Sequence, residues 1–122
     1  NPKDVDAFVN RGFALTRLEK QGEAAESFKR AVALNPRHPV AWYNLGLSYM
    51  SLKQYDNAVT AFQNAAKLVP DDPEPYVWLS NAYQQKGMTK EADAAYAQAY
   101  ALRAKRMQQI QQQQQQQQRR RQ

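Results

Sequence analysis

Matched residues recur at every thirty-fourth position, and this recurrence constrains the chain more than any other feature. Gly12 and Gly46 lie 34 residues apart, and Ser80, a third small residue, lies 34 residues further on. The same step connects further columns of similar size and polarity: Phe8, Trp42 and Tyr76; Leu15, Tyr49 and Tyr83; Ala24, Ala58 and Ala92; Phe28, Phe62 and Tyr96; Ala31, Ala65 and Ala99; Pro2, Pro36 and Pro70. A chain of 122 residues with this pattern is predicted to be a short array of structural repeats.

Each repeat has the apolar spacing of two helices separated by a short break. In the second repeat, residues 42–52 place large apolar side chains on one helix face, and residues 58–68 form a second apolar stripe. In the third repeat Gly87 lies in the break and suits the left-handed backbone that ends a helix, and Thr89 is predicted to cap the next helix. Each repeat is therefore predicted to be a helical hairpin.

Small residues on the two helices predict that their backbones approach closely. In the second repeat these are Gly46 and Ala58, and Trp42, Tyr49 and Phe62 are predicted to fill the space on either side. Burial of one large aromatic side chain contributes about 1.5–3 kcal/mol, but a lone hairpin cannot bury both of its faces. Stacking of successive hairpins is expected to complete the core.

The net charge of +6 is confined to the C-terminal end of the chain. Residues 1–102 hold 11 basic and 11 acidic side chains, so this part is neutral. The excess lies on Arg103, Lys105, Arg106, Arg119, Arg120 and Arg121. This distribution excludes a uniformly basic nucleic-acid-binding domain. We expect no nucleic-acid binding beyond the salt-sensitive attraction of this tail for acidic partners.

The residue inventory leaves little room for chemistry. The chain has no cysteine and one histidine, His38, so neither a thiolate site nor a multi-histidine metal centre is available. Its four glycines are isolated, which excludes a phosphate-binding loop, and no apolar run exceeds four residues, so no membrane span is predicted. Asp72 and His38 each precede a proline and are expected to begin helices. We expect no enzyme activity, no catalytic residue, no metal and no cofactor.

The repeated motif resembles the tetratricopeptide repeat. The resemblance is carried by three sets, each followed by its Ala, Phe or Tyr, and Ala positions: Phe8, Arg11, Gly12 and Leu15; Trp42, Leu45, Gly46 and Tyr49; Tyr76, Leu79, Ser80 and Tyr83. The departures are Arg11 for the usual leucine, Ser80 for glycine and Ala104 for proline. The resemblance implies an all-α fold, a right-handed α-solenoid of three helix-turn-helix hairpins with an extended C-terminal helix.

The period sets the expected boundaries. Repeats are predicted at residues 5–38, 39–72 and 73–106. Pro2 occupies the closing position of a repeat, so residues 1–4 are expected to be the end of a preceding one. Residues 107–122, rich in glutamine and arginine, are predicted to continue the last helix or to be disordered, because a stable helix nucleates the residues that follow it. Three roles stay open for this polyglutamine segment: a solvated extension, a coiled-coil or partner-binding helix, and a nuclear-import or nucleic-acid segment.

The resemblance also implies a binding surface, because the first helices of such hairpins line the concave side of the solenoid. Residues predicted to form a peptide-binding groove there are Val9, Asn10, Phe13, Arg17, Tyr43, Asn44, Leu47, Met50, Val77, Trp78 and Asn81. Several are large and apolar and lie outside the core stripes, and such exposed patches mark partner sites. The alternative is that some pack against neighbouring repeats. Asn10 and Asn44 either hold a peptide backbone or bond within their own repeat.

Chaperone-tail binding, a familiar activity of the family, requires cations at set groove positions. Here those positions hold Val9, Glu74 and Trp78, so that specificity is rejected. The groove suits an apolar or aromatic anchor on an extended or helical partner segment.

We therefore predict a non-catalytic protein-interaction scaffold. Two alternatives are a self-assembly module, which forms homo-oligomers through the uncapped last repeat or the glutamine-rich helix, and a fragment of a transcriptional co-regulator. The sequence leaves the cellular location unassigned.

Overall fold

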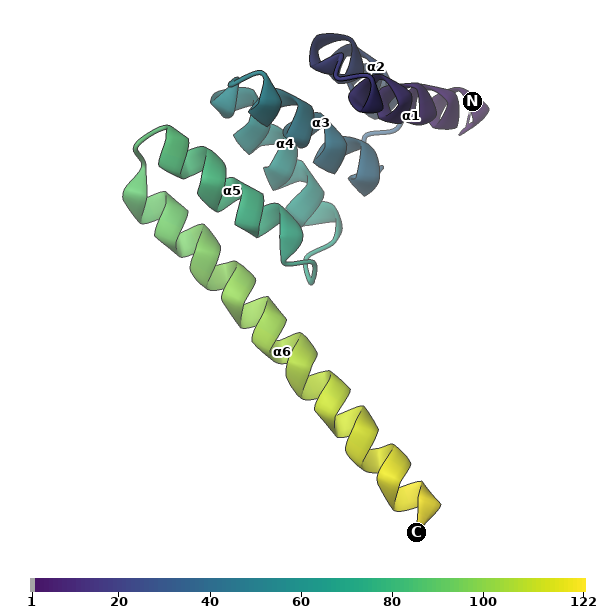
Figure 1. Ribbon diagram of the computed structural model, residues 1–122, viewed down its shortest axis with the longest axis vertical. Coiled ribbons are helices and arrows are strands. Elements are labelled where there is room, and N and C mark those ends of the chain that lie inside the picture. The colour runs from purple at the N-terminus through teal and green to yellow at the C-terminus, as the bar shows by residue number, and fades with distance from the viewer. Residues whose placement is uncertain (1) are drawn as a thin grey trace.

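The computed structural model describes residues 2–122, and these residues form six helices and no strand (Figure 1). The helices are α1 (Pro2–Arg17), α2 (Gln21–Leu34), α3 (Pro39–Ser51), α4 (Tyr55–Leu68), α5 (Glu74–Gln85) and α6 (Thr89–Arg121). Consecutive helices pack on one another, so α1–α2, α3–α4 and α5–α6 are three hairpins stacked in chain order. The predicted all-α solenoid with an extended C-terminal helix is confirmed.

A phenylalanine ring packed against a glycine sets the spacing within the first two hairpins. A methyl group at Gly12 would lie 2.5 Å from the ring of Phe28, and one at Gly46 would lie 2.6 Å from the ring of Phe62. In the third hairpin Ser80 takes the place of glycine, and the facing aromatic residue, Tyr96, is 56% exposed. A larger side chain is tolerated there because the ring opposite it is not enclosed.

The core runs across the boundaries between repeats. One buried cluster joins α1 and α2 to α3 and α4: Val5, Val9, Ala24, Ala25, Phe28, Ala31, Val32, Ala41, Leu45 and Ala61. A second joins α4 to α5 and α6: Ala58, Val59, Phe62, Leu79, Ala82 and Ala95. Each hairpin therefore completes the core of its neighbour, as expected for stacked repeats.

The helix ends follow the local sequence signals with one exception. The Nδ1 atom of His38 accepts a hydrogen bond from the Ala41 backbone N–H at 3.1 Å, and Asp72 Oδ1 accepts one from the Glu74 N–H at 3.0 Å. Gly87 has a φ of +74°, the left-handed conformation that ends α5. The prediction that Thr89 caps α6 is wrong: Met88 precedes the helix, Thr89 is its first residue, and no side chain bonds to the first turn.

Helix α6 continues well past the other helices as a projecting rod (Figure 1). Its 33 residues correspond to about 50 Å at the rise of an α-helix. From residue 103 onward every side chain is exposed. None of the described helices combines the length and the apolarity needed to cross a bilayer.

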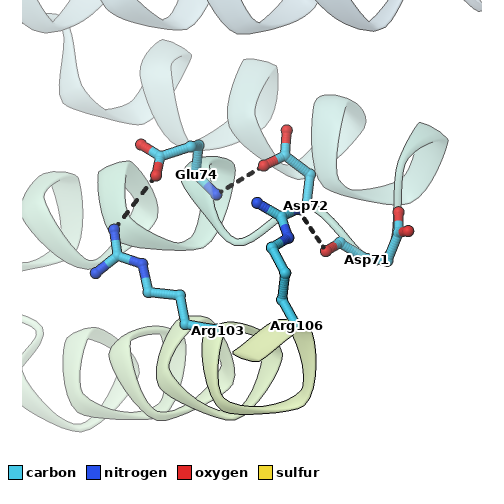
Figure 2. Close-up of polar contacts among 5 residues, drawn as sticks. All are labelled: Asp71, Asp72, Glu74, Arg103 and Arg106. Carbon is cyan, nitrogen blue, oxygen red and sulfur yellow. Dashed lines mark hydrogen bonds and ion pairs between the residues drawn. The ribbon is translucent and has the colours of Figure 1, made fainter. Parts of the chain in front are cut away.

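Two arginines connect α6 to the loop and first turn of α5 (Figure 2). The Arg103 guanidinium lies 3.3 Å from a Glu74 carboxylate oxygen, and Arg106 donates to the Asp71 backbone carbonyl at 3.5 Å. Both side chains of the ion pair are about half exposed, at 51% and 50%, so its contribution to stability is small, about 0–1 kcal/mol. These contacts orient α6 at the point where its burial ends.

The glycine–phenylalanine contact is tested by Gly46→Ala. The added methyl group would overlap the buried Phe62 ring, so we expect the free energy of unfolding to fall by about 1–3 kcal/mol in urea denaturation. Gly22→Ala is the matched control, because nothing lies within 4 Å of the new methyl group and the site is exposed. The control should be neutral or slightly stabilising. Equal losses in the two variants would contradict the close-approach account.

Removal of residues 107–122 tests whether α6 contributes to the core beyond the third repeat. All of these residues are exposed, so we expect the urea midpoint of the truncated chain to stay close to that of the whole chain. The expected change in unfolding free energy is within about 0.5 kcal/mol. A larger loss would show that the projecting segment stabilises the stack.

Candidate functional site

The predicted site residues lie on α1, α3 and α5, the first helices of the three hairpins. Helices of one set follow one another along the stack, so equivalent positions come from successive repeats. We call the first-helix surface the set that excludes Val9: Asn10, Phe13, Arg17, Tyr43, Asn44, Leu47, Met50, Val77, Trp78 and Asn81.

Val9 is buried and does not belong to this surface. It is 6% exposed and lies in the first core cluster with Val5. The equivalent positions 34 and 68 residues later hold Tyr43 and Val77, which are half-buried. The short β-branched side chain of Val9 ends within the core, so its assignment as a groove residue is corrected here.

The large apolar members of the first-helix surface are half-buried. Tyr43, Leu47, Met50 and Trp78 pack against the second core cluster, and Phe13 packs against the first. Asn10 and Arg17 are exposed at the α1 end of the surface, and Asn81 is half-buried on α5. Packing and exposure therefore coexist at these positions: one side of each apolar group supports the core and the other faces solvent.

An aromatic group organises the centre of this surface. Tyr43 meets the buried Phe62 ring edge-on, with centroids 5.8 Å apart, and Trp78 stacks on the same ring at 6.2 Å. Phe13 and Phe28 form an edge-on pair at 5.7 Å in the first hairpin. Such pairs contribute about 0.5–1.5 kcal/mol beyond their buried area. Phe62 therefore holds one aromatic residue from α3 and one from α5 in fixed positions.

Burial raises the pKa of Tyr43 above its ordinary value of 10.0. A hydrogen bond from the Trp78 side chain lowers the pKa in part, and the carboxylates of Glu74 and Asp72 raise it further. The Tyr43 hydroxyl is thus neutral throughout the physiological range, and it connects the second hairpin to the third. Burial likewise raises the pKa of Tyr49, with Lys29 lowering it.

The polar members are partly committed to local bonds. The Asn44 side-chain N–H donates to the Val40 carbonyl at 2.8 Å, within its own helix. Of the two roles considered for this residue, the bond within the repeat is the one observed, and it leaves the Asn44 side-chain oxygen as an acceptor. Glu74, at the start of α5, pairs with Arg103 (Figure 2).

Two functional features of this region were not predicted from the sequence. The Arg103–Glu74 pair joins residues 29 apart, and no local pattern indicates it because it depends on the path of α6. The role of Phe62 as the support beneath Tyr43 and Trp78 was also missed. The column Phe28, Phe62 and Tyr96 was assigned to the core alone, although a ring with two faces can carry residues from two helices.

The described part of the chain contains no group of three or more histidine, cysteine, aspartate or glutamate side chains arranged to hold a metal ion. The surface offers aromatic faces, a thioether and carboxamides, which bind by packing and hydrogen bonding.

The sequence matches two descriptions of one family. The first, TPR repeat, matches residues 14–53 and 46–87, and the second, tetratricopeptide repeat, matches residues 73–106. Together they cover most of the chain, and the chain belongs to the tetratricopeptide repeat family. No curated protein matches the sequence.

Solved structures of the same architecture match over most of the chain. A crystal structure of MamA is 28% identical with a TM-score of 0.82, and the match covers 85% of this chain and 61% of MamA. The second TPR domain of Spaghetti (RPAP3), bound to the HSP90 peptide SRMEEVD, is 18% identical with a TM-score of 0.77, covering 81% of this chain and 92% of that one. The Yersinia enterocolitica type III secretion translocator chaperone SycD is 20% identical with a TM-score of 0.78, covering 84% and 77%. The chain thus spans about three-fifths of MamA.

The raised pKa of Tyr43 predicts a loss of stability at alkaline pH. Because the folded-state pKa lies above the unfolded value of 10.0, the contribution is complete below pH 10 and is lost as the pH rises through the folded-state value. Tyr43→Phe removes the ionisable group, so we expect its unfolding free energy to fall less than that of the native chain between pH 9 and 11.5. Parallel pH curves for the two proteins would contradict the burial of this hydroxyl.

Proposed function

We propose that the chain is a non-catalytic protein-interaction scaffold that binds a peptide or helix of a partner on the first-helix surface. The observation that carries the proposal is the aromatic group on Phe62. Tyr43 and Trp78 are held in place by this buried ring and remain half-exposed. Large, preordered aromatic side chains are the usual anchors of binding energy, since little side-chain entropy is lost when a partner docks.

The chemistry of the surface supports a partner with an apolar or aromatic anchor. Leu47 and Met50 extend the apolar area beside Tyr43 along α3, and the Met50 thioether adapts to varied shapes. The carboxamides of Asn10 and Asn81 flank this area and offer both donors and acceptors to a peptide backbone. An extended segment or an amphipathic helix would satisfy both features.

The bound HSP90 peptide of the RPAP3 domain, SRMEEVD, is acidic. We propose a different specificity for this chain. At the positions considered for a carboxylate clamp, Val9 is buried, Trp78 is uncharged, and Glu74 is itself an anion whose partner is Arg103. A carboxylate arriving here would meet like charge from Glu74 and Asp72 and would find no cation within the aromatic group.

The proposal is tested with a library of random twelve-residue peptides selected against the immobilised whole chain. We expect the selected peptides to share an aromatic or large aliphatic residue and not a C-terminal acidic pair. Labelled versions are then titrated by fluorescence anisotropy. Tyr43→Ala and Trp78→Ala should each weaken binding about 5- to 30-fold, equivalent to about 1–2 kcal/mol.

Two controls separate binding from folding. Lys67→Ala changes an exposed residue on α4, outside the first-helix surface, and should leave the affinity unchanged. Because Tyr43 and Trp78 also pack on Phe62, circular dichroism and urea denaturation must show that each variant is folded under the assay conditions. Folded variants that bind the selected peptides as tightly as the native chain would exclude this surface as the site.

A further inference from the structure

The first helix exposes a face that is buried at every internal junction of this chain. Ala7, Arg11 and Ala14 lie on one side of α1 and are exposed. We call them the head face. The residues at equivalent positions in the later repeats are buried: Ala41, Leu45 and Ser48 on α3, and Pro75, Leu79 and Ala82 on α5. The head face therefore has the position, but not the burial, of a surface that receives a preceding hairpin.

The last helix exposes the opposite half of the same kind of junction. Asp93, Tyr96 and Tyr100 are exposed on α6, and we call them the tail face. Tyr96 is 56% and Tyr100 69% exposed. Their equivalents in the earlier repeats are buried: Ala25, Phe28 and Val32 on α2, and Val59, Phe62 and Ala66 on α4. The tail face has the position of a surface that receives a following hairpin.

The internal junctions show how these two faces would meet. Helix α2 packs on α3, and α4 packs on α5. Ala25 and Leu45 belong to one buried cluster, and Val59 and Leu79 belong to the other. One further step of 34 residues along the tail side leads to Asp93, and one step back along the head side leads to Arg11. An apolar pair inside the stack is thus replaced by opposite charges at its two ends.

A second pair of positions changes in the same coordinated way. Between the second and third hairpins, the Gln63 side-chain amide donates to the Tyr83 hydroxyl at 3.2 Å. One junction earlier, Lys29 lies close enough to Tyr49 to lower its pKa. The corresponding positions at the ends of the stack hold Ala97 and Leu15. Here a polar partner and a hydroxyl are replaced together by two apolar side chains, so the ends again match each other.

We propose that a second copy of this chain docks head-to-tail, with the head face of one copy on the tail face of the other and Arg11 opposite Asp93. The junction would repeat the geometry of the two internal ones. Because the two faces differ, each copy keeps one unused face after docking, and the assembly is open-ended and not a closed dimer. This interaction is independent of the peptide binding proposed above, since it uses neither Tyr43 nor Trp78.

Charge reversal tests the proposal by sedimentation velocity over a concentration series. We expect the average mass of the native chain to rise with concentration without a plateau at two copies. Arg11→Asp and Asp93→Arg should each weaken association about 10-fold or more, because each places like charges together. Both changes in one chain, or an equimolar mixture of the two single variants, should restore association.

Arg37→Asp provides the matched control, because it makes the same change of charge in the exposed connection between α2 and α3. It should leave association unchanged, and circular dichroism should show every variant folded. A native chain that stays monomeric at all concentrations would overturn the proposal. So would a closed dimer that survives Arg11→Asp and is lost in Ile110→Arg, which would assign association to the projecting part of α6. Failure of the double variant to associate while folded would also overturn it.

Discussion

The contact between a phenylalanine ring and a backbone without a side chain is the constraint on which the rest of this molecule depends. Phe62 can lie flat inside its hairpin only because Gly46 presents no Cβ atom. The same ring supports Tyr43 from α3 and Trp78 from α5. A single buried side chain thus sets the spacing of one hairpin, its junction with the next, and the aromatic centre of the candidate binding surface. Core and site are the same packing arrangement viewed from two sides.

Much of the fold follows from the residues alone because repeat proteins use the same local solution several times. The columns of glycine, alanine and aromatic residues predict helical hairpins, and the lack of a helix breaker after residue 102 predicts the long α6. The candidate site was predicted less well. The repeat position of Val9 matches that of Tyr43, yet Val9 is buried. Position assigns a residue to a helix face, whereas the length of its side chain decides whether any of it reaches solvent.

Other features depend on where distant backbone segments arrive in space. The ion pair of Arg103 with Glu74 needs α6 to continue straight past the first turn of α5, and the cap expected from Thr89 fails because the helix begins at that residue. Asn44 bonds to its own helix, a choice that the carboxamide makes among several available partners. These outcomes are set by rotamers and by tertiary path, and neither is encoded in a spacing rule.

The departures from the repeat pattern follow a physical rule of their own. Arg11 replaces an otherwise buried leucine on a face that no hairpin covers, and Ser80 replaces glycine opposite a tyrosine that is not enclosed. Ala104 replaces a proline where α6 continues as helix and does not turn into a connection. Each substitution is tolerated because the contact that normally forbids it is missing there. Irregularities in a repeat therefore locate the surfaces where stacking stops, and the opposite charges of Arg11 and Asp93 make two of those surfaces complementary.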